Sequence, residues 1–352
     1  MDVKRANAAT VAQLDAFDEI IDVRSPGEFH IDHVPGAVNC PVLDDEQRAR
    51  IGTMYKQISP FEAKKAGAAL VSKNIAGHIE ERFRGRGRAW RPLVYCWRGG
   101  QRSASMAHVL REVGWDAATL EGGYRAYRRE VLVQLEVLPA RLRFRVLCGA
   151  TGSGKSRLLA AIAATGAQIL DLERLARHRG SLLGDLPGEP QPSQKMFDSL
   201  VWAELRDFDP SRPVYVEAES KKIGQLQVPA GLLERMRTGD CVRLEVPVAE
   251  RQRFLIDEYR HFLSAPTDLK RKLEGLTVHY GRSVVERWLS LADAGAWRDL
   301  VGDLLHTHYD PSYLRATAKN YLHYDSGRKL SLERLDEAGI ESAAAELSRS
   351  PV

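Results

Sequence analysis

A glycine-rich turn that ends in Lys155 and Ser156 constrains the fold of this chain more than any other feature of its sequence. Residues 149–156 read GATGSGKS, the apolar run RFRVLC precedes them, and the helical run SRLLAAIAA continues from Ser156. A GxxxxGKS pattern binds phosphate when it lies between a strand and a helix, as it does here. A chance match in a glycine-rich turn is the alternative, and the flanking strand and helix argue against it. The turn predicts an α/β fold with a parallel sheet.

The residues of this turn have separate expected roles. Backbone N–H groups from Thr151 to Lys155 would donate to phosphate oxygens, and Lys155 would add a point charge. The Ser156 hydroxyl would coordinate Mg²⁺ if a nucleotide binds. The expected phosphate-binding residues are Gly149, Thr151, Gly152, Ser153, Gly154, Lys155 and Ser156.

Charged residues follow two further predicted strands, at the edge where open α/β sheets bind ligands. Asp171 in QILDLE and Glu217 in VYVEAES each lie at the end of a predicted strand, so each is a candidate for ordering a magnesium ion or acting as a base. A helix cap or a surface acid is the alternative for both. The neighbouring candidates, which are otherwise residues of solvated loops, are Arg177, Arg179, Glu219 and Lys221.

The length of 352 residues exceeds what one core usually supports and predicts two domains, residues 1–138 and 139–352. In the first, short apolar runs alternate with helical stretches: EIIDVR, AVNCPV, RPLVYCW and AATLEGG. In the second, RFRVLCG, QILDLE, PVYVEAES and CVRLEVPV do the same, and helical periods follow Pro247. We expect a helix-ending turn at Pro311, in HTHYDPSY, and a short helix with a frayed end from Gly327 on.

Cys96 ends the apolar run LVYC and is followed at once by WRGGQRS. Gly99 and Gly100 allow successive N–H groups to point at one centre, and Arg98 and Arg102 add positive potential. This environment should lower the pKa of Cys96, because nearby cations favour the thiolate. A buried structural cysteine is the alternative. We take Cys96 as the candidate catalytic residue, supported by the loop residues Arg98, Gly99, Gly100 and Arg102.

The remaining composition decides little about function. With 51 basic and 47 acidic residues, any RNA-binding surface must be local. The run ERFRGRGRAWR interleaves arginines with Phe83 and Trp90, a composition suited to phosphate contacts and base stacking, although a mobile basic loop would look the same. Its candidate RNA contacts are Arg82, Arg84, Arg86 and Arg88.

The four cysteines form no CxxC pair and no cluster with histidines at metal-ligand spacing, so we expect no metal centre built from them. The N-terminal run MDVKRANAATVAQLDAF lacks an apolar segment of signal-peptide length, and no run approaches membrane-spanning length. We therefore expect a cytoplasmic enzyme with reduced thiols.

The N-terminal segments resemble a known family. The segment IDVRSPGEFHIDHVPGAVNCPV, the loop CWRGGQRS and the later LEGGYRAY are together similar to a rhodanese domain, whose loop cysteine accepts sulfur as a persulfide and passes it on. The matching positions, in the expected order, are Asp22, Arg24, Glu28, His33, Pro35 and Gly36. A phosphatase is the alternative, since Cys96 and Arg102 also fit the spacing used in phosphoester chemistry.

A rhodanese domain followed by a P-loop domain, with DLERLARHRGSLLG, VEAESKKIG and HYDPSY behind it, resembles the tRNA 2-selenouridine synthase family over nearly the whole chain. The resemblance implies a transferase that replaces sulfur by selenium in wobble 2-thiouridine of tRNA, with selenophosphate as selenium donor. It also implies an S-geranyl intermediate made from geranyl diphosphate, and no covalently bound cofactor. An ATP-dependent tRNA thiolase or kinase and a non-catalytic RNA-binding adaptor are the alternatives.

Overall fold

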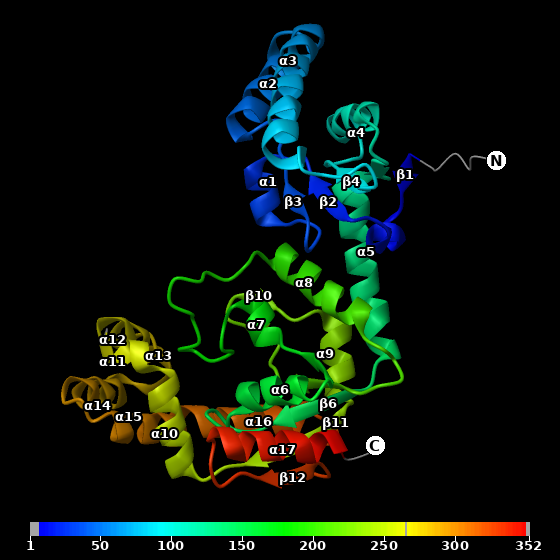
Figure 1. The fold of residues 1–352 in the computed structure, drawn as a ribbon. Coiled ribbons are helices and arrows are strands. Elements are labelled where there is room, and N and C mark those ends of the chain that lie inside the picture. The colour runs from blue at the N-terminus through cyan, green and yellow to red at the C-terminus, as the bar shows by residue number, and fades with distance from the viewer. Residues whose placement is uncertain (1–6, 265, 350–352) are drawn as a thin grey trace. The chain divides into compact units, whose positions relative to one another are not determined.

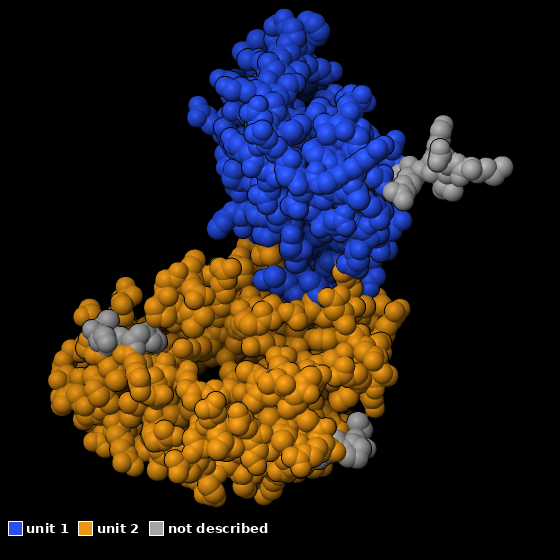
Figure 2. Space-filling model, in the orientation of Figure 1, with its two compact units in different colours: residues 1–134, 198–203 blue, residues 135–197, 204–352 orange. Residues whose placement is uncertain are grey.

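The computed structural model describes residues 7–264 and 266–349 (Figure 1). The N-terminal run considered above therefore begins outside the described residues, as does the predicted frayed end at 350–352. The chain divides into two compact units, coloured separately in Figure 2. The first contains residues 1–134 and 198–203, and the second contains residues 135–197 and 204–352.

The first unit is built on a parallel sheet in the order β1-β5-β4-β2-β3. Its strands are β1 (Ala8–Ala9), β2 (Glu19–Asp22), β3 (Val38–Asn39), β4 (Pro92–Tyr95) and β5 (Ala118–Leu120). All four residues of β4 are buried, as expected for a central parallel strand covered on both faces. The four strands β2 to β5 confirm the runs predicted from the sequence.

Helices and short helical turns connect these strands. They are η1 (Val11–Ala16), α1 (Pro26–Ile31), α2 (Asp45–Gln57), α3 (Pro60–His78), η2 (Ile79–Phe83), α4 (Gln101–Val113) and α5 (Gly123–Val137), with η3 (Leu138–Arg141) following α5. The helices α2 and α3 begin at residues that cap them: Asp44 accepts the Gln47 N–H, and Ser59 precedes Pro60.

The second unit has a parallel sheet in the order β12-β11-β6-β8-β7. Its strands are β6 (Phe144–Cys148), β7 (Gln168–Leu170), β8 (Val214–Glu217), β11 (Asp240–Glu245) and β12 (Arg328–Ser331); β9 (Lys222–Ile223) and β10 (Leu226–Gln227) form a separate hairpin. The helices that follow these strands in the chain are α6 (Lys155–Ala164), α7 (Leu172–Ala176), α8 (Gln194–Asp207), α9 (Ala230–Arg237) and α17 (Glu337–Arg349), and residues 198–203 of α8 belong to the first unit. The α/β class predicted for both parts of the chain is confirmed.

A helical region follows β11 and has its own core, in which Leu273, Trp288 and Leu300 are buried. Its elements are α10 (Val248–Glu258), α11 (Arg260–Ser264), α12 (Pro266–Glu274), α13 (Thr277–Tyr280), α14 (Arg282–Asp293), α15 (Trp297–Leu304), η4 (Leu305–Tyr309) and α16 (Asp310–Asn320). This confirms the helical region predicted after Pro247. In the described ranges, no helix is long and apolar enough to cross a membrane.

Two local predictions are wrong. Pro311 does not end a helix: it lies in the first turn of α16, where a missing N–H costs nothing, and η4 leads directly into that helix. The segment after Gly327 begins with strand β12 before helix α17. Only Leu330 of β12 is buried, so the strand has little apolar pattern of its own and depends on pairing with β11.

Candidate active site

Cys96 lies directly after β4, at the start of a loop that leads into the N-terminus of α4. The residue is only 3% exposed. Ser103, in the first turn of α4, donates its hydroxyl hydrogen to Cys96 Sγ at 3.2 Å. Sequence reasoning missed Ser103, although its place at the start of a helix behind the loop is visible in CWRGGQRS.

The pKa of Cys96 lies below that of an ordinary thiol. Burial raises it, but hydrogen bonds from the Ser103 hydroxyl and from the backbone N–H groups of Ser103 and Arg98 outweigh burial, and the charge of Arg102 adds to them. The direction agrees with the sequence prediction. The backbone N–H groups and the Arg102 charge contribute as expected, and the Ser103 hydroxyl, which the prediction lacked, contributes ahead of both.

The segment LEGGYRAY is distant from Cys96 in the sequence but packs against the cysteine loop, and its glycine pair makes this close approach possible. A Cβ atom on Gly123 would come within 2.3 Å of the Cys96 carbonyl oxygen and 2.4 Å of the Gly99 nitrogen, and the φ of Gly123 is +57°. The Tyr124 N–H donates to that same Cys96 carbonyl at 2.9 Å. The Tyr124 ring stacks on Trp97 with centroids 5.1 Å apart, which leaves Trp97 36% exposed beside the cysteine.

The other rhodanese-like positions form the support behind this loop. Arg24 is buried and forms an ion pair with Asp22 at 2.6 Å. Glu28 forms an ion pair with Arg102 at 3.1 Å and another with Arg48 at 3.0 Å. Arg102 is thus held in place by Glu28 at the N-terminus of α4.

The positions His33, Pro35 and Gly36 follow α1, and the His33 ring stacks on Phe29 with centroids 3.7 Å apart. His33 Nδ1 lies 2.8 Å from the Phe29 carbonyl oxygen. Gly36 has a φ of +80° and open space around its Cα. The structure therefore gives these residues a part in the turn that leads to β3.

The phosphate-binding turn connects β6 to α6, as the motif requires. Gly152 and Gly154 have φ angles of +81° and +75°, which only glycine adopts readily. Lys155 Nζ donates to the Gly149 carbonyl oxygen at 2.7 Å, and Ser153 is buried in the turn. The backbone of a loop of this kind presents its N–H groups to one anion.

HYDPSY, which the sequence left without a role, packs against this turn. The Gly149 N–H donates to the Tyr313 hydroxyl at 2.5 Å, and Lys155 Nζ lies 5.5 Å from the centroid of the Tyr313 ring. Arg251 connects the same segment to the turn: its Nε donates to the Thr151 carbonyl at 2.9 Å, and its Nη1 donates to Asp310 at 3.1 Å.

Three glutamates gather beside Ser156: Glu173, Glu217 and Glu219 each offer a carboxylate oxygen within 4.8 Å of the others. The Ser156 hydroxyl donates to Glu173 Oε2 at 3.2 Å. Burial raises the pKa of all three, that of Glu219 to about 8, and their mutual repulsion adds to the shifts of Glu173 and Glu219. Glu173 was not among the sequence candidates.

The remaining charged candidates differ in their positions. Asp171 caps α7 by accepting the Arg174 N–H at 2.8 Å. A helix cap was the predicted alternative to a magnesium ligand or a base at this position. Arg177 is exposed at the C-terminal end of α7, with a φ of +49°. Arg179 and Lys221 line the phosphate-loop pocket, and Arg179 Nη1 donates to the Glu258 carbonyl at 2.7 Å.

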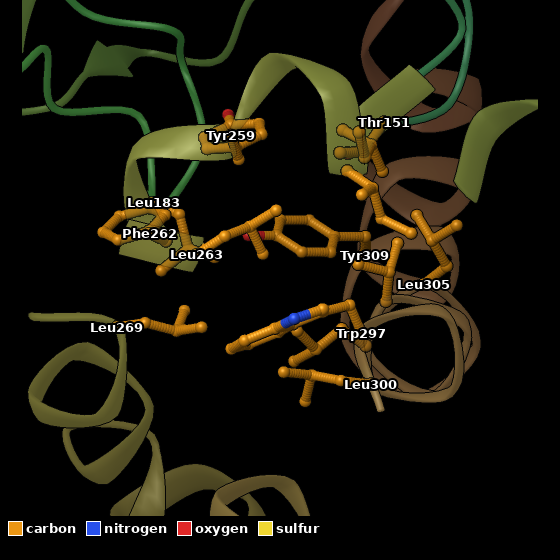
Figure 3. A pocket seen from close by; sticks show the side chains of 14 residues that line it. Thr151, Leu183, Tyr259, Phe262, Leu263, Leu269, Trp297, Leu300, Leu305 and Tyr309 are labelled. Atoms are coloured by element: carbon orange, nitrogen blue, oxygen red, sulfur yellow. The ribbon is translucent and has the colours of Figure 1, made fainter. Parts of the chain in front are cut away.

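Two hollows adjoin at the phosphate-binding turn. The larger, about 630 Å³, is lined by the turn from Thr151 to Arg157 and by the three glutamates. The smaller, about 60 Å³, is almost entirely apolar, and Figure 3 shows the Tyr309 ring in it between Thr151 and Trp297. Four residues line both hollows: Thr151, Leu255, Tyr259 and Tyr309.

The arginine run near residue 86 differs from the expected RNA-binding surface. Phe83 and Trp90 are buried in the core of the first unit, so they are not available for base stacking. Arg86 and Arg82 lie 2.7 and 3.8 Å from Glu19. Arg84 and Arg88 are exposed.

Comparison with protein families matches both parts of the chain. The model described as a rhodanese-like domain matches residues 6–130, and the model described as the tRNA 2-selenouridine synthase AAA domain matches residues 142–282.

Individual relatives agree with these matches. A tRNA 2-selenouridine synthase from Bdellovibrio bacteriovorus is 30% identical over 86% of this chain and 90% of its own. One from Alcanivorax borkumensis is 32% identical over 84% of this chain and 88% of its own. One from Nitrosomonas europaea is 35% identical over 68% of this chain, and this match spans 63% of that relative. The chain therefore belongs to the tRNA 2-selenouridine synthase family.

Proposed function

We propose that this protein converts 2-thiouridine at the wobble position of tRNA to 2-selenouridine, in two steps that use its two candidate sites. The name of the relatives supports the overall reaction. In the first step, the thiocarbonyl sulfur of the base is alkylated by geranyl diphosphate. In the second step, the selenium of selenophosphate attacks carbon 2 of the base, geranylthiol leaves from that carbon, and the phosphoryl group passes to water.

The observation that carries the first step is the apolar hollow that adjoins the phosphate-binding turn. A prenyl diphosphate has a strongly anionic head and a hydrocarbon chain, and the two adjoining hollows offer matching surfaces. The enclosed space of the apolar hollow is about 60 Å³, so the lining side chains would have to move apart to admit a geranyl chain. We place the diphosphate at the turn and the geranyl chain between Tyr309, Trp297 and Leu300.

The turn would promote alkylation by stabilising the leaving group. As the sulfur attacks the first carbon of the geranyl chain, the carbon–oxygen bond breaks and inorganic pyrophosphate leaves with its electron pair. The base loses its N3 proton. Lys155 and the N–H groups of the turn are positioned to stabilise the charge that develops on the pyrophosphate. This use of the motif requires no ATP hydrolysis.

The second step belongs to Cys96 in this proposal. Alkylation makes the sulfur a better leaving group, and selenium delivery needs a soft nucleophile that is ionised near neutral pH. The hydrogen bonds of the Cys96 loop favour the thiolate over the thiol. We therefore assign to Cys96 assistance in this displacement, in which selenium keeps its oxidation state and no oxidant is needed.

The tRNA would approach both sites, and the exposed groups near Cys96 supply candidate contacts. Trp97 presents an aromatic face next to the cysteine, and Arg84 and Arg88 are exposed cations of the same unit. The four cysteines are free. Free thiols and a tRNA substrate are consistent with a reaction in the cytoplasm.

The test is mass spectrometry of nucleosides from 2-thiouridine tRNA incubated with the protein, geranyl diphosphate and selenophosphate. We expect selenouridine with the wild-type protein, S-geranyl-2-thiouridine with Cys96→Ala, and unmodified 2-thiouridine with Lys155→Ala. Geranyl transfer that persists in Lys155→Ala would contradict the assignment of the turn. An unchanged base with the wild-type protein, together with tRNA-stimulated ATP turnover, would favour an ATP-dependent enzyme.

A further inference from the structure

The helices α2 and α3 of the first unit lie side by side as a hairpin (Figure 1). Only Ile58 and Ser59 connect them. The Ser59 N–H donates to the Met54 carbonyl at 3.1 Å, and the Ser59 hydroxyl accepts the Phe61 N–H at 3.2 Å. These bonds fix the backbone where one helix ends and the next begins. We call residues 55–65 the hairpin tip.

Three large side chains of the hairpin tip are exposed. Tyr55, Ile58 and Phe61 are 51, 72 and 67% exposed. The contact between the two helices uses other residues: Gly67 of α3 is buried, and a Cβ atom on it would lie 3.5 Å from the Ile51 side chain of α2. Exposed apolar residues that are grouped in this way mark an interaction site, whereas single scattered ones do not.

The hairpin tip is also basic. It contains three lysines, Lys56, Lys64 and Lys65, and a single acidic residue, Glu62. That acidic residue pairs with Lys65 at 2.8 Å, so the charges of Lys56 and Lys64 remain in excess. Both of these lysines are exposed, one on each helix. The tip therefore attracts a polyanion.

Aromatic and basic side chains lie next to each other here. Lys65 Nζ lies 5.1 Å from the centroid of the Phe61 ring, and Tyr55 is followed directly by Lys56. An exposed ring can stack on an unpaired base while a neighbouring ammonium group binds phosphate, which is how proteins bind single-stranded parts of RNA. Protein–protein interfaces are instead depleted of lysine, so the composition of the tip favours RNA over a protein partner.

We propose that the hairpin tip binds the tRNA substrate, with Lys56 and Lys64 on phosphates and Tyr55 and Phe61 on unpaired bases. The choice of tRNA as the RNA rests on the proposed function, whereas the RNA-binding surface itself does not. The tip lies in the same unit as Cys96 but is separate from the cysteine loop in the sequence. We expect it to contribute affinity for tRNA and no chemistry.

The experiment measures the Kd of the full-length protein for fluorescently labelled 2-thiouridine tRNA by anisotropy at several salt concentrations, with no geranyl or selenium donor. The double variant Lys56→Ala/Lys64→Ala should raise the Kd by about tenfold or more. It should also lower the slope of log Kd against log salt concentration by about two, one for each lost phosphate contact. The matched control is Lys329→Ala/Arg349→Ala, which removes the same charge from exposed positions on β12 and α17 of the second unit.

A second variant tests the aromatic part of the surface. Tyr55→Ala should raise the Kd by about tenfold, because stacking on a base is lost, and Tyr55→Phe should retain most of the affinity. The melting temperature and the rate of Cys96 alkylation should stay unchanged in every variant, since the substituted side chains are exposed.

The outcomes separate this proposal from the proposed function. An unchanged Kd and salt slope in Lys56→Ala/Lys64→Ala would overturn the RNA-binding surface even if the wild-type protein forms selenouridine. Weakened binding in this variant and in Tyr55→Ala, but not in the control, would support the surface even if no base is modified. A dimer that Tyr55→Ala converts to monomers, with tRNA affinity unchanged, would show that the tip binds a second copy of the chain and would overturn the proposal.

Discussion

At the scale of single residues, hydrogen-bond donors lower the pKa of Cys96 more than the nearby arginine charge does. Ser103 is fully buried, and its hydroxyl lies 3.2 Å from Cys96 Sγ and 3.1 Å from the Gly100 carbonyl oxygen. Arg102, one of the two candidate cations of the loop, shares its charge with Glu28. The thiolate is therefore stabilised mainly by short-range donors, which are less sensitive to salt than an exposed arginine.

The first prediction concerns the pH dependence of Cys96 alkylation. Because the pKa of Cys96 is lowered, the rate of reaction with iodoacetamide should reach half its maximum below the ordinary thiol value of about 8.5. Ser103→Ala removes a donor to the thiolate and should move this midpoint to higher pH. Peptide mass spectrometry identifies the alkylated cysteine. Ser105→Ala, on the same helix, is the control, and an equal shift in both variants would contradict the role of Ser103.

The second prediction concerns Trp97. Stacking on a nucleobase contributes about 1–3 kcal/mol, so Trp97→Ala should raise the KM for tRNA by about tenfold or more. Trp97→Phe should retain most of the affinity, since it keeps an aromatic face. The rate of Cys96 alkylation reports whether the loop remains intact. An unchanged KM in Trp97→Ala, with normal alkylation, would exclude Trp97 from tRNA binding.

At the scale of elements, the N-terminus of α5 holds the cysteine loop by close backbone contact. Tyr124 and Arg125 donate their N–H groups to the carbonyls of Cys96 and Trp97. This contact requires glycine at residue 123, because any Cβ there would overlap the loop backbone. The cysteine loop, and not the sheet, therefore requires the second glycine of LEGGYRAY after β5.

The third prediction follows from that contact. Gly123→Ala should lower the melting temperature and slow Cys96 alkylation, because the methyl group must displace the loop backbone. Gly114→Ala is the matched control: Gly114 also has a positive φ, +107°, but has nothing within 4 Å of an added Cβ. Backbone strain alone would affect both variants equally. Similar losses in both would therefore show that the contact with Cys96 is unimportant.

The helices α15 and η4 supply one wall of the apolar hollow, and the fourth prediction tests its ligand. Val301→Phe places extra volume in the hollow, and overpacking costs about 1–3 kcal/mol. The KM for geranyl diphosphate should rise by about tenfold, while inhibition by inorganic pyrophosphate should stay unchanged. Val278→Phe, at a position that is 90% exposed on α13, is the control. Equal weakening of both ligands by Val301→Phe would argue against a chain in this hollow.

At the scale of the whole molecule, the two units carry different parts of the proposed reaction. Cys96 and its supporting groups lie within the first unit, and the phosphate-binding turn, the glutamates and both hollows lie within the second. If each unit performs one step, a substitution in one unit should abolish that unit's step and leave the other step intact.

The fifth prediction uses this separation. We expect tRNA geranylated by the Cys96→Ala protein and then repurified to be converted to selenouridine by the Lys155→Ala protein with selenophosphate. The double variant, given the same tRNA, should leave it geranylated. Liquid chromatography with mass spectrometry distinguishes the two nucleosides. Failure of Lys155→Ala to use geranylated tRNA would mean that the turn is needed for both steps.

Much of this protein could be predicted from local sequence patterns. The buried strands of both sheets have continuous apolar runs, and the GATGSGKS and CWRGGQRS turns depend on glycines at fixed positions, so short segments were sufficient to predict them. The boundaries of such segments and the chemistry of their turns are set by local backbone preferences, which each segment carries with it. The direction of the Cys96 pKa shift could be predicted for the same reason.

Other features were decided only by the tertiary structure. Asp171 and Glu173 are both acidic residues that follow β7. In the folded chain, Asp171 caps a helix and Glu173 accepts a hydrogen bond from Ser156. The Tyr313 hydroxyl accepts a hydrogen bond from the Gly149 N–H, although the two residues are 164 positions apart in the sequence. The segment of β12 forms a strand because it pairs with β11. Side-chain direction and strand pairing depend on partners far along the chain, and no local pattern specifies those partners.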